Sequence, residues 1–141
     1  MECRNKNDRK RSLALTELIT NLPPDYEYVS LQKEVRENDR KALSESPIRH
    51  FEEYLLDFTD TAALCELVDL VISVDTSVAH LAGSIGKKTW LLLPYVPDWR
   101  WLLNRCDSPW YVSMLLYRQK QDRQWLPVLK RLNKDLLQFF V

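Results

Sequence analysis

The chain has 141 residues, which is the size of one ordinary domain and is long enough to bury a single core. Apolar residues make up 45% of it, with five Trp, six Tyr and four Phe, and this composition excludes a disordered chain. Twenty Lys and Arg balance twenty Asp and Glu, so the overall charge gives no argument for a nucleic-acid or membrane partner.

The cysteines and the N-terminus indicate the compartment. Cys3, Cys65 and Cys106 are odd in number and widely spaced, a pattern that predicts neither disulfides nor a zinc site and favours a reducing cytoplasm. With two histidines and no marked carboxylate cluster, we expect no metal site. The start of the chain lacks the apolar core of a signal peptide, and no apolar run reaches the ~18 residues of a spanning helix. We therefore expect a cytoplasmic protein without a membrane span.

The first third of the chain predicts a helix followed by two strands. Leucine and isoleucine recur at helical spacing over residues 12–22, and two prolines then end the helix. Residues 26–32 are rich in aromatic and β-branched side chains and predict a strand. The polar segment 33–46 is expected to be a loop or a short exposed helix, and a short strand is expected around 48–51.

The next elements alternate between helix and strand. A helix is expected from residue 60, capped by Asp60 or Thr59, with Cys65 in the core and four apolar residues packing inward, namely Ala62, Ala63, Leu64 and Leu67. Buried strands are expected at 70–74 and 88–94, because both are short continuous apolar runs. Between them lies a helix over 76–85 that Gly86 ends, with a core side formed by Val78, Leu81, Ala82 and Ile85.

The tail over 123–140 predicts an amphipathic helix with Pro127 in its first turn, and its leucines are expected to cover the sheet edge: Leu126, Leu129, Leu132, Leu136 and Leu137. This order of elements predicts one α/β domain over 1–141, with a Rossmann-like, doubly wound parallel sheet. A doubly wound domain normally begins on a strand, whereas this chain opens with a basic loop and a helix. We therefore expect it to be a piece of a longer protein.

Hydroxyls and a histidine follow the strand at 70–74. Asp75, Thr76, Ser77 and His80 stand where that strand gives way to the helix at 76–85. Ligands bind at the carboxyl ends of strands in open α/β sheets, and free N–H groups at a helix N-terminus favour a phosphate. The alternative is that Asp75 or Thr76 only caps the helix and that His80 is a surface residue. Gly83 is small enough for a neighbour to come close.

Five segments, in this order, carry a resemblance to a known family: KNDRKRS (6–12), VSLQKE (29–34), DFTDTAAL (57–64), VISVDTSVAHLAGSIGK (71–87) and LLLPYVPDWRWLLNRCDSPWYVSMLLYRQ (91–119). Together they resemble the C-terminal part of bacterial tetratricopeptide-repeat glycosyltransferases. These enzymes belong to the heptosyltransferase-like glycosyltransferase family 9 and are relatives of O-linked N-acetylglucosamine transferases.

The resemblance implies the C-terminal half of a GT-B enzyme, which binds a nucleotide-diphosphate sugar as donor and transfers the sugar to a protein or glycan acceptor. It implies no metal and no other cofactor. By resemblance, Asp75, Thr76, Ser77 and His80 face the donor diphosphate. The other implied binding residues are the cations Lys6 and Arg9, Gln32 and Lys33 near the nucleoside, and Asp57 and Phe58 (with Thr59) beside the base and ribose.

The sequence also departs from that family. The first strand with its glycine-containing turn, the acceptor-binding N-terminal domain and the helical repeats are absent. A catalytic base usually comes from the missing half, so no catalytic residue is assigned, and the isolated chain is expected to bind a donor without transferring sugar. The alternative is a non-catalytic interaction module, a truncated or degenerate domain of the same fold. Nucleic-acid binding through the basic N-terminus rests on five cations alone and has the least support.

The Trp-rich segment has two interpretations. Its aromatic residues are either core and interface residues or sugar-stacking platforms, and those left bare by a missing domain would promote self-association: Trp99, Trp101, Trp110 and Tyr111. Asp98 and Arg100 are expected to form an ion pair or a cap.

Overall fold

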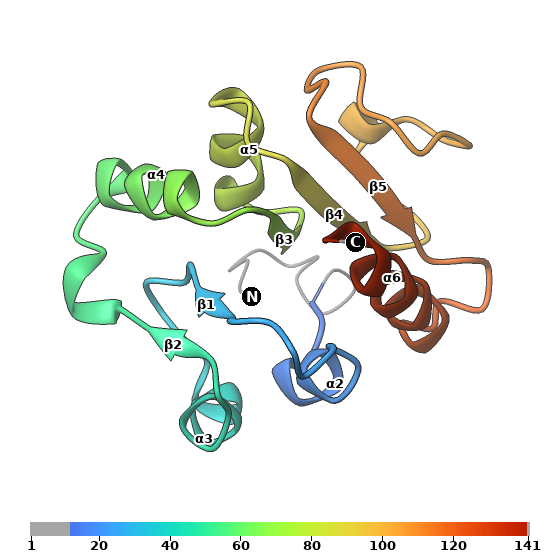
Figure 1. Ribbon diagram of the computed structural model, residues 1–141. Coiled ribbons are helices and arrows are strands. Elements are labelled where there is room, and N and C mark those ends of the chain that lie inside the picture. The colour runs from blue at the N-terminus through green and yellow to red at the C-terminus, as the bar shows by residue number, and fades with distance from the viewer. Residues whose placement is uncertain (1–11, 141) are drawn as a thin grey trace.

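The computed structural model describes residues 12–140, and the chain is an α/β protein whose parallel strands form two small sheets (Figure 1). The first sheet pairs β1 (Val29–Ser30) with β2 (Arg49–His50), in the register Val29 to Arg49. The helix α3 (Glu37–Ser44) connects these two strands, and α2 (Leu15–Thr20) packs against α3.

The second sheet has the order β3-β4-β5, with all three strands parallel. Its strands are β3 (Val71–Val74), β4 (Thr89–Leu93) and β5 (Met114–Arg118). A short 3₁₀ turn, η1 (Glu52–Tyr54), and the helix α4 (Phe58–Leu67) lead from β2 to β3, and α5 (Ser77–Ser84) leads from β3 to β4. A long connection that contains the 3₁₀ turn η2 (Trp99–Trp101) joins β4 to β5, and α6 (Leu126–Phe139) ends the fold.

The core lies on both faces of β4, which is buried along its whole length. Side chains alternate across a strand, so Trp90 and Leu92 pack on one face with residues of α2 and α6, while Leu91 and Leu93 pack on the other with Ala79 of α5. Figure 1 shows the same layers, with α4 and α5 above the strands and α2, α3 and α6 below them. Because helices cover both faces of the sheet at β4, the sequence of this strand is a continuous apolar run.

Two hydrogen bonds connect α6 to the N-terminal segment around residues 21–26. The Tyr26 hydroxyl donates to the Leu136 carbonyl (2.9 Å), and the Asn133 side chain donates to the Asn21 carbonyl (2.7 Å). The lower layer is therefore closed by residues more than a hundred positions apart in the sequence.

Most of the expected elements are confirmed, including the helix between 12 and 22, the strands near 29, 49, 72 and 91, and the two helices that follow β3 and β5. The polar segment 33–46 contains α3, which settles the choice between loop and helix. Gly86 ends α5 with φ of 74°, as expected of a glycine that follows a helix. Residues 114–118 were not expected to form a strand, and they form the edge strand β5.

The expected core faces of the helices were partly wrong. In α4 the buried residues are Thr61 and Cys65, whereas Leu67 is 82% exposed. In α5 they are Ala79, Ala82 and Gly83, because small side chains let this helix lie close to the sheet and to the loop above it. Four residues of α6 are buried, and they include Val128 in place of the half-exposed Leu126 and Leu137: Val128, Leu129, Leu132 and Leu136.

Within residues 12–140, no helix combines the length and the apolar character that crossing a bilayer requires.

Candidate functional site

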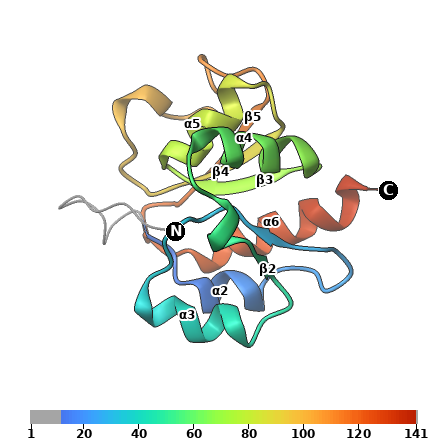
Figure 2. The ribbon, with the colours of Figure 1, turned by 90° about the vertical axis from the view of Figure 1, so that its left-hand side faces the viewer.

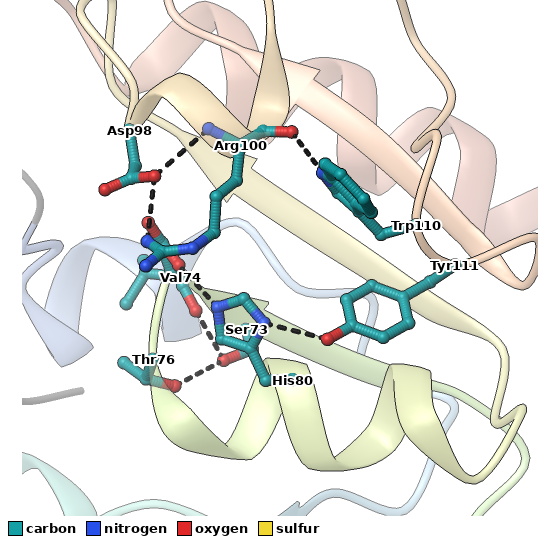
Figure 3. A network of polar contacts seen from close by, with 9 residues as sticks. Ser73, Val74, Thr76, His80, Asp98, Arg100, Trp110 and Tyr111 are labelled. Carbon is teal, nitrogen blue, oxygen red and sulfur yellow. Dashed lines mark hydrogen bonds and ion pairs between the residues drawn. The ribbon is translucent and has the colours of Figure 1, made fainter.

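The turn between β3 and α5 leaves the N-terminus of the helix without a side-chain cap (Figure 3). Thr76 is the N-cap residue, with extended backbone (φ −138°, ψ 170°), but its hydroxyl lies 3.1 Å from the Ser73 hydroxyl. The Ser73 hydroxyl in turn donates to the Val74 carbonyl (2.7 Å). Thr76 therefore occupies the N-cap position of α5 without capping the helix through its side chain, so the alternative that Thr76 only caps this helix is not confirmed.

His80, one turn along α5, is held by three side chains. Its Nε2 lies 3.4 Å from Oδ1 of Asp75, and its Nδ1 lies 3.1 Å from the Tyr111 hydroxyl. Its ring also stacks on Trp101, with the centroids 5.3 Å apart and the planes at 29°. Since both ring nitrogens have partners within the chain, His80 fixes the positions of Asp75 and Tyr111, and its own donor capacity is already used.

Asp75 is a buried carboxylate at the end of β3, with its side chain 7% exposed against 35% for that of His80. A buried carboxylate is stable only where it is hydrogen-bonded or paired, and His80 is one such partner. Ser77, the first residue of α5, is exposed. Of the four residues expected at this turn, Ser77 is thus the most exposed.

The loop after β4 brings a cation to the same edge of the sheet. Asp98 caps η2, because its Oδ1 accepts hydrogen bonds from the Arg100 backbone N–H (3.1 Å) and from the Arg100 guanidinium (2.9 Å). The expected ion pair and the expected cap are both present. Figure 3 shows the side chain of Arg100 directed toward the turn that carries Thr76 and His80.

Arg100 was not expected among the binding residues. The available signal was its place on the loop that follows β4, since β4 is the neighbour of β3 and the carboxyl ends of parallel strands meet at one edge. The guanidinium also lies over the Trp99 ring, 5.2 Å from its centroid, and the Trp110 indole donates to the Arg100 carbonyl (2.8 Å).

The aromatic residues of this loop divide into two kinds. Trp101 is fully buried beneath the loop, and this confirms a core role for it. Trp99 and Trp110 are 71% and 60% exposed, so they are surface aromatics, and both contact Arg100.

A second group of expected residues follows the first sheet. The Lys33 ammonium donates to the Leu56 carbonyl (2.8 Å) and so ties the segment after β1 to the turn before α4. Asp57 caps α4 by accepting from the N–H groups of Thr59 (2.8 Å) and Asp60 (3.2 Å), while the Asp60 carboxylate accepts from the Asp57 N–H (3.2 Å). This capping box corrects the expected cap, which was placed at Asp60 or Thr59.

The remaining residues of this group have simpler surroundings. Phe58 is 60% exposed, and the backbone N–H of Gln32 donates to the Ser30 hydroxyl (3.4 Å). Lys6 and Arg9 lie outside the described residues. Among residues 12–140, no three His, Cys, Asp or Glu side chains gather in a way that would hold a metal ion.

Comparison with curated proteins finds similarity to Protein FlbA of Caulobacter vibrioides, at 34% identity over 83 residues. The match spans 59% of this chain and 14% of FlbA, so it covers a small part of a much longer protein. No protein-family model matches the chain, and no solved structure matches it.

Proposed function

We propose that this chain is the donor-binding domain of a GT-B glycosyltransferase, with a Rossmann-like fold, and that it seats the diphosphate of a nucleotide sugar at the N-terminus of α5. The observation that carries the proposal is that Thr76, the N-cap residue of that helix, does not cap it with its side chain, although the helix begins at the carboxyl end of a buried strand. Such a terminus combines unpaired N–H groups with the positive end of the helix dipole, and both favour a phosphate.

Two side chains complete this seat. The exposed hydroxyl of Ser77 stands at the first position of α5 and adds a donor to the backbone N–H groups. Arg100 approaches from the next loop and is held in place by Asp98. A guanidinium and N–H donors directed at a leaving nucleoside diphosphate stabilise the charge that develops on it, which lowers the barrier without a bound metal.

In this proposal His80 is a positioning residue. It holds Asp75 and Tyr111 behind the turn, and its ring nitrogens point to those two partners. Gln32, Lys33, Asp57 and Phe58 then belong to the nucleoside side of the site, since they follow the carboxyl ends of β1 and β2. Asp57 has a capping role in addition.

The test is a two-dimensional NMR titration of the chain with UDP, GDP and ADP. We expect saturable shifts of the Ser77, Val78 and Ala79 amides with one nucleotide, and the nucleotide that saturates first identifies the base. The absence of shifts at these amides with all three nucleotides contradicts the proposal.

Ser77→Pro is the sharpest variant, because proline at the first position of a helix keeps the helix while removing one N–H and the hydroxyl. We expect both Ser77→Pro and Arg100→Gln to weaken nucleotide binding. Ser84→Ala is the matched control, because Ser84 is an exposed serine at the far end of the same helix. Equal weakening by Ser84→Ala would mean that the nucleotide does not bind at the N-terminus of α5.

The exposed loop aromatics favour a second candidate, a non-catalytic interaction module that associates through this surface. Large apolar side chains are exposed together along the connection between β4 and β5: Val96, Trp99, Leu103, Trp110 and Val112. If this candidate is right, sedimentation shows that the chain forms a dimer. The double variant Trp99→Ser, Trp110→Ser is then monomeric, whereas the control Leu67→Ser, on the exposed side of α4, remains a dimer. A monomer at all concentrations removes self-association.

A further inference from the structure

The connection between β4 and β5 runs back along the outer edge of the three-stranded sheet. After η2 the chain turns through two residues with left-handed backbone, Leu102 (φ 54°) and Asn104 (φ 57°). It then lies antiparallel to β5, where the Leu116 N–H donates to the Cys106 carbonyl (2.7 Å). Figure 2 shows that α6 begins on the side of the molecule where this connection lies.

An open pocket of about 420 Å³ lies between this connection, β5 and α6. Each of the three elements contributes an arginine to its lining: Arg105 comes from the connection, Arg118 from the end of β5 and Arg131 from the second turn of α6. Asp107 is the one carboxylate among the lining residues, so three positive charges face one negative charge. The lining therefore has a surplus of two positive charges.

Arg118 is the arginine whose charge is least compensated. It is half-buried, its Nε donates to the Arg105 carbonyl (2.8 Å), and its Nη2 donates to the Trp101 carbonyl. Both acceptors are neutral, and no carboxylate of residues 12–140 forms an ion pair with Arg118. Burial and the nearby Arg105 guanidinium lower the pKa of Arg118, so its surroundings disfavour its charge. A buried charge is stable where it is paired, and an anion in the pocket would supply the missing partner.

The other two arginines are held by carboxylates. The Arg105 guanidinium binds Asp107 through two hydrogen bonds (2.8 and 2.7 Å). The Nε of Arg131 lies 3.7 Å from Oδ2 of Asp135, an oxygen that also accepts from the Tyr117 hydroxyl (2.9 Å). A guanidinium has more N–H donors than these contacts use, so donors remain on all three arginines.

We infer that this pocket binds a phosphate group, either as inorganic phosphate or as part of a small phosphate monoester. The guanidinium fork matches the oxygens of a phosphate, and a phosphate dianion equals the charge surplus of the lining. A tetrahedral phosphate can also present oxygens to arginines from three different elements, whereas a carboxylate has two oxygens in one plane. The lining shares no residue with the turn between β3 and α5, so this site is separate from the proposed diphosphate seat.

The test is an NMR titration of the whole chain with inorganic phosphate, glycerol phosphate and acetate in separate experiments. At about pH 8 a phosphate monoester is a dianion, because its second pKa is about 6, and constant ionic strength keeps charge screening fixed. The signals followed are the Cys106 and Asp107 amides and the Arg118 Nε–H. We expect saturable shifts with both phosphate compounds, and binding of acetate that is weaker by about tenfold. The phosphate compound that binds more tightly identifies the source of the phosphate group.

Arg131→Gln is the sharpest variant, because Arg131 makes none of the hydrogen bonds that hold the loop. Arg49→Gln is its matched control, since the two side chains are 54% and 63% exposed and each is paired with one carboxylate, Asp135 or Glu27. Both variants lower the net charge by one. We expect Arg131→Gln to weaken phosphate binding by about tenfold and Arg49→Gln to leave it unchanged.

The inference fails if neither phosphate compound shifts these signals saturably, or if acetate binds as tightly as phosphate. Equal weakening by Arg131→Gln and Arg49→Gln would also overturn it, because general electrostatic attraction would then explain the binding. Phosphate bound at the N-terminus of α5 shifts the Ser77 and Ala79 amides instead. Ser77→Pro weakens that binding and leaves the shifts at Cys106 and Asp107, so the two sites are tested separately.

Discussion

The ring of Tyr111 lies against Gly83 of α5 so closely that a Cβ atom at Gly83 would stand 2.6 Å from the Cγ atom of Tyr111. The expectation that Gly83 lets a neighbour come close is thereby confirmed, and the neighbour is a side chain. The Tyr111 hydroxyl contacts His80, and His80 in turn contacts Asp75. Because Gly83 lets the Tyr111 ring lie this close to α5, it helps to set the positions of all three side chains.

Gly83→Ala is expected to destabilise the protein. Within a helix this change alone would stabilise by about 1 kcal/mol. Here the added methyl group meets the Tyr111 ring, and overpacking typically costs about 1–3 kcal/mol. Urea unfolding measures the difference. Ser84→Ala, the next residue and an exposed one, gives the propensity gain without the clash, and a Gly83→Ala protein as stable as Ser84→Ala would contradict the packing described.

Replacing His80 is expected to cost stability as well as binding. His80→Leu removes a partner of the buried Asp75 carboxylate, and the expected loss in unfolding free energy is about 1–3 kcal/mol. A double-mutant cycle with Tyr111→Phe measures the coupling across the 3.1 Å contact, which we expect at about 0.5–3 kcal/mol. Strictly additive losses would mean that the two side chains do not interact.

Asp57→Ala separates the two roles assigned to Asp57. Losing the capping box of α4 should lower the free energy of unfolding by about 1 kcal/mol. Asp57→Asn, which keeps a capping oxygen, should retain most of this stability. If Asp57→Asn weakens nucleotide binding while remaining stable, Asp57 acts on the ligand; if it binds normally, its role is structural.

The stability of the fold is expected to fall at high pH. Burial, aided by Tyr26 and Asp25, raises the pKa of Tyr28 from 10.0 to about 12, and burial with the Asp135 hydrogen bond also raises that of Tyr117. The protonated form is therefore favoured by folding, so this contribution is full below pH 10.0 and is lost as the pH rises to about 12.

Tyr28→Phe tests this assignment. The variant lacks the hydrogen bond from the Tyr28 hydroxyl to the Pro23 carbonyl, so it should be less stable at neutral pH. Its unfolding free energy should then fall less steeply than that of the unaltered protein between pH 10.0 and about 12, with the remaining slope due to Tyr117. An unchanged slope would show that Tyr28 does not titrate abnormally.

The strands buried on both faces were predictable because their signal is local. β3 and β4 are short apolar runs bounded by polar residues, and that pattern alone marks a covered parallel strand. β5 was missed because it lies in a segment dense in Trp, Pro and charge. Its end, Arg118, donates to the Arg105 and Trp101 carbonyls, contacts that only the folded loop provides.

In the candidate site, too, local features were predictable from the sequence and contacts between distant segments were not. The turn that carries Asp75, Thr76, Ser77 and His80 could be placed from the sequence because it follows a strand that is itself recognisable. Their interactions were not predictable, because His80 contacts Tyr111, 31 positions away, and the Thr76 hydroxyl contacts that of Ser73 instead of capping the helix. The nearness of Arg100 to this turn was not predictable for a related reason, since it depends on β3 and β4 being neighbours.

The hydrogen bonds that connect α6 to residues 21 and 26 have a consequence for the folding pathway. Residues 71–118 form β3, α5, β4 and β5 through contacts between near neighbours in the sequence, and such contacts close small loops at low entropic cost. The bonds from Tyr26 to Leu136 and from Asn133 to Asn21 need a loop of more than a hundred residues. The three-stranded unit should therefore form first, and the two ends of the chain should come together last and separate first.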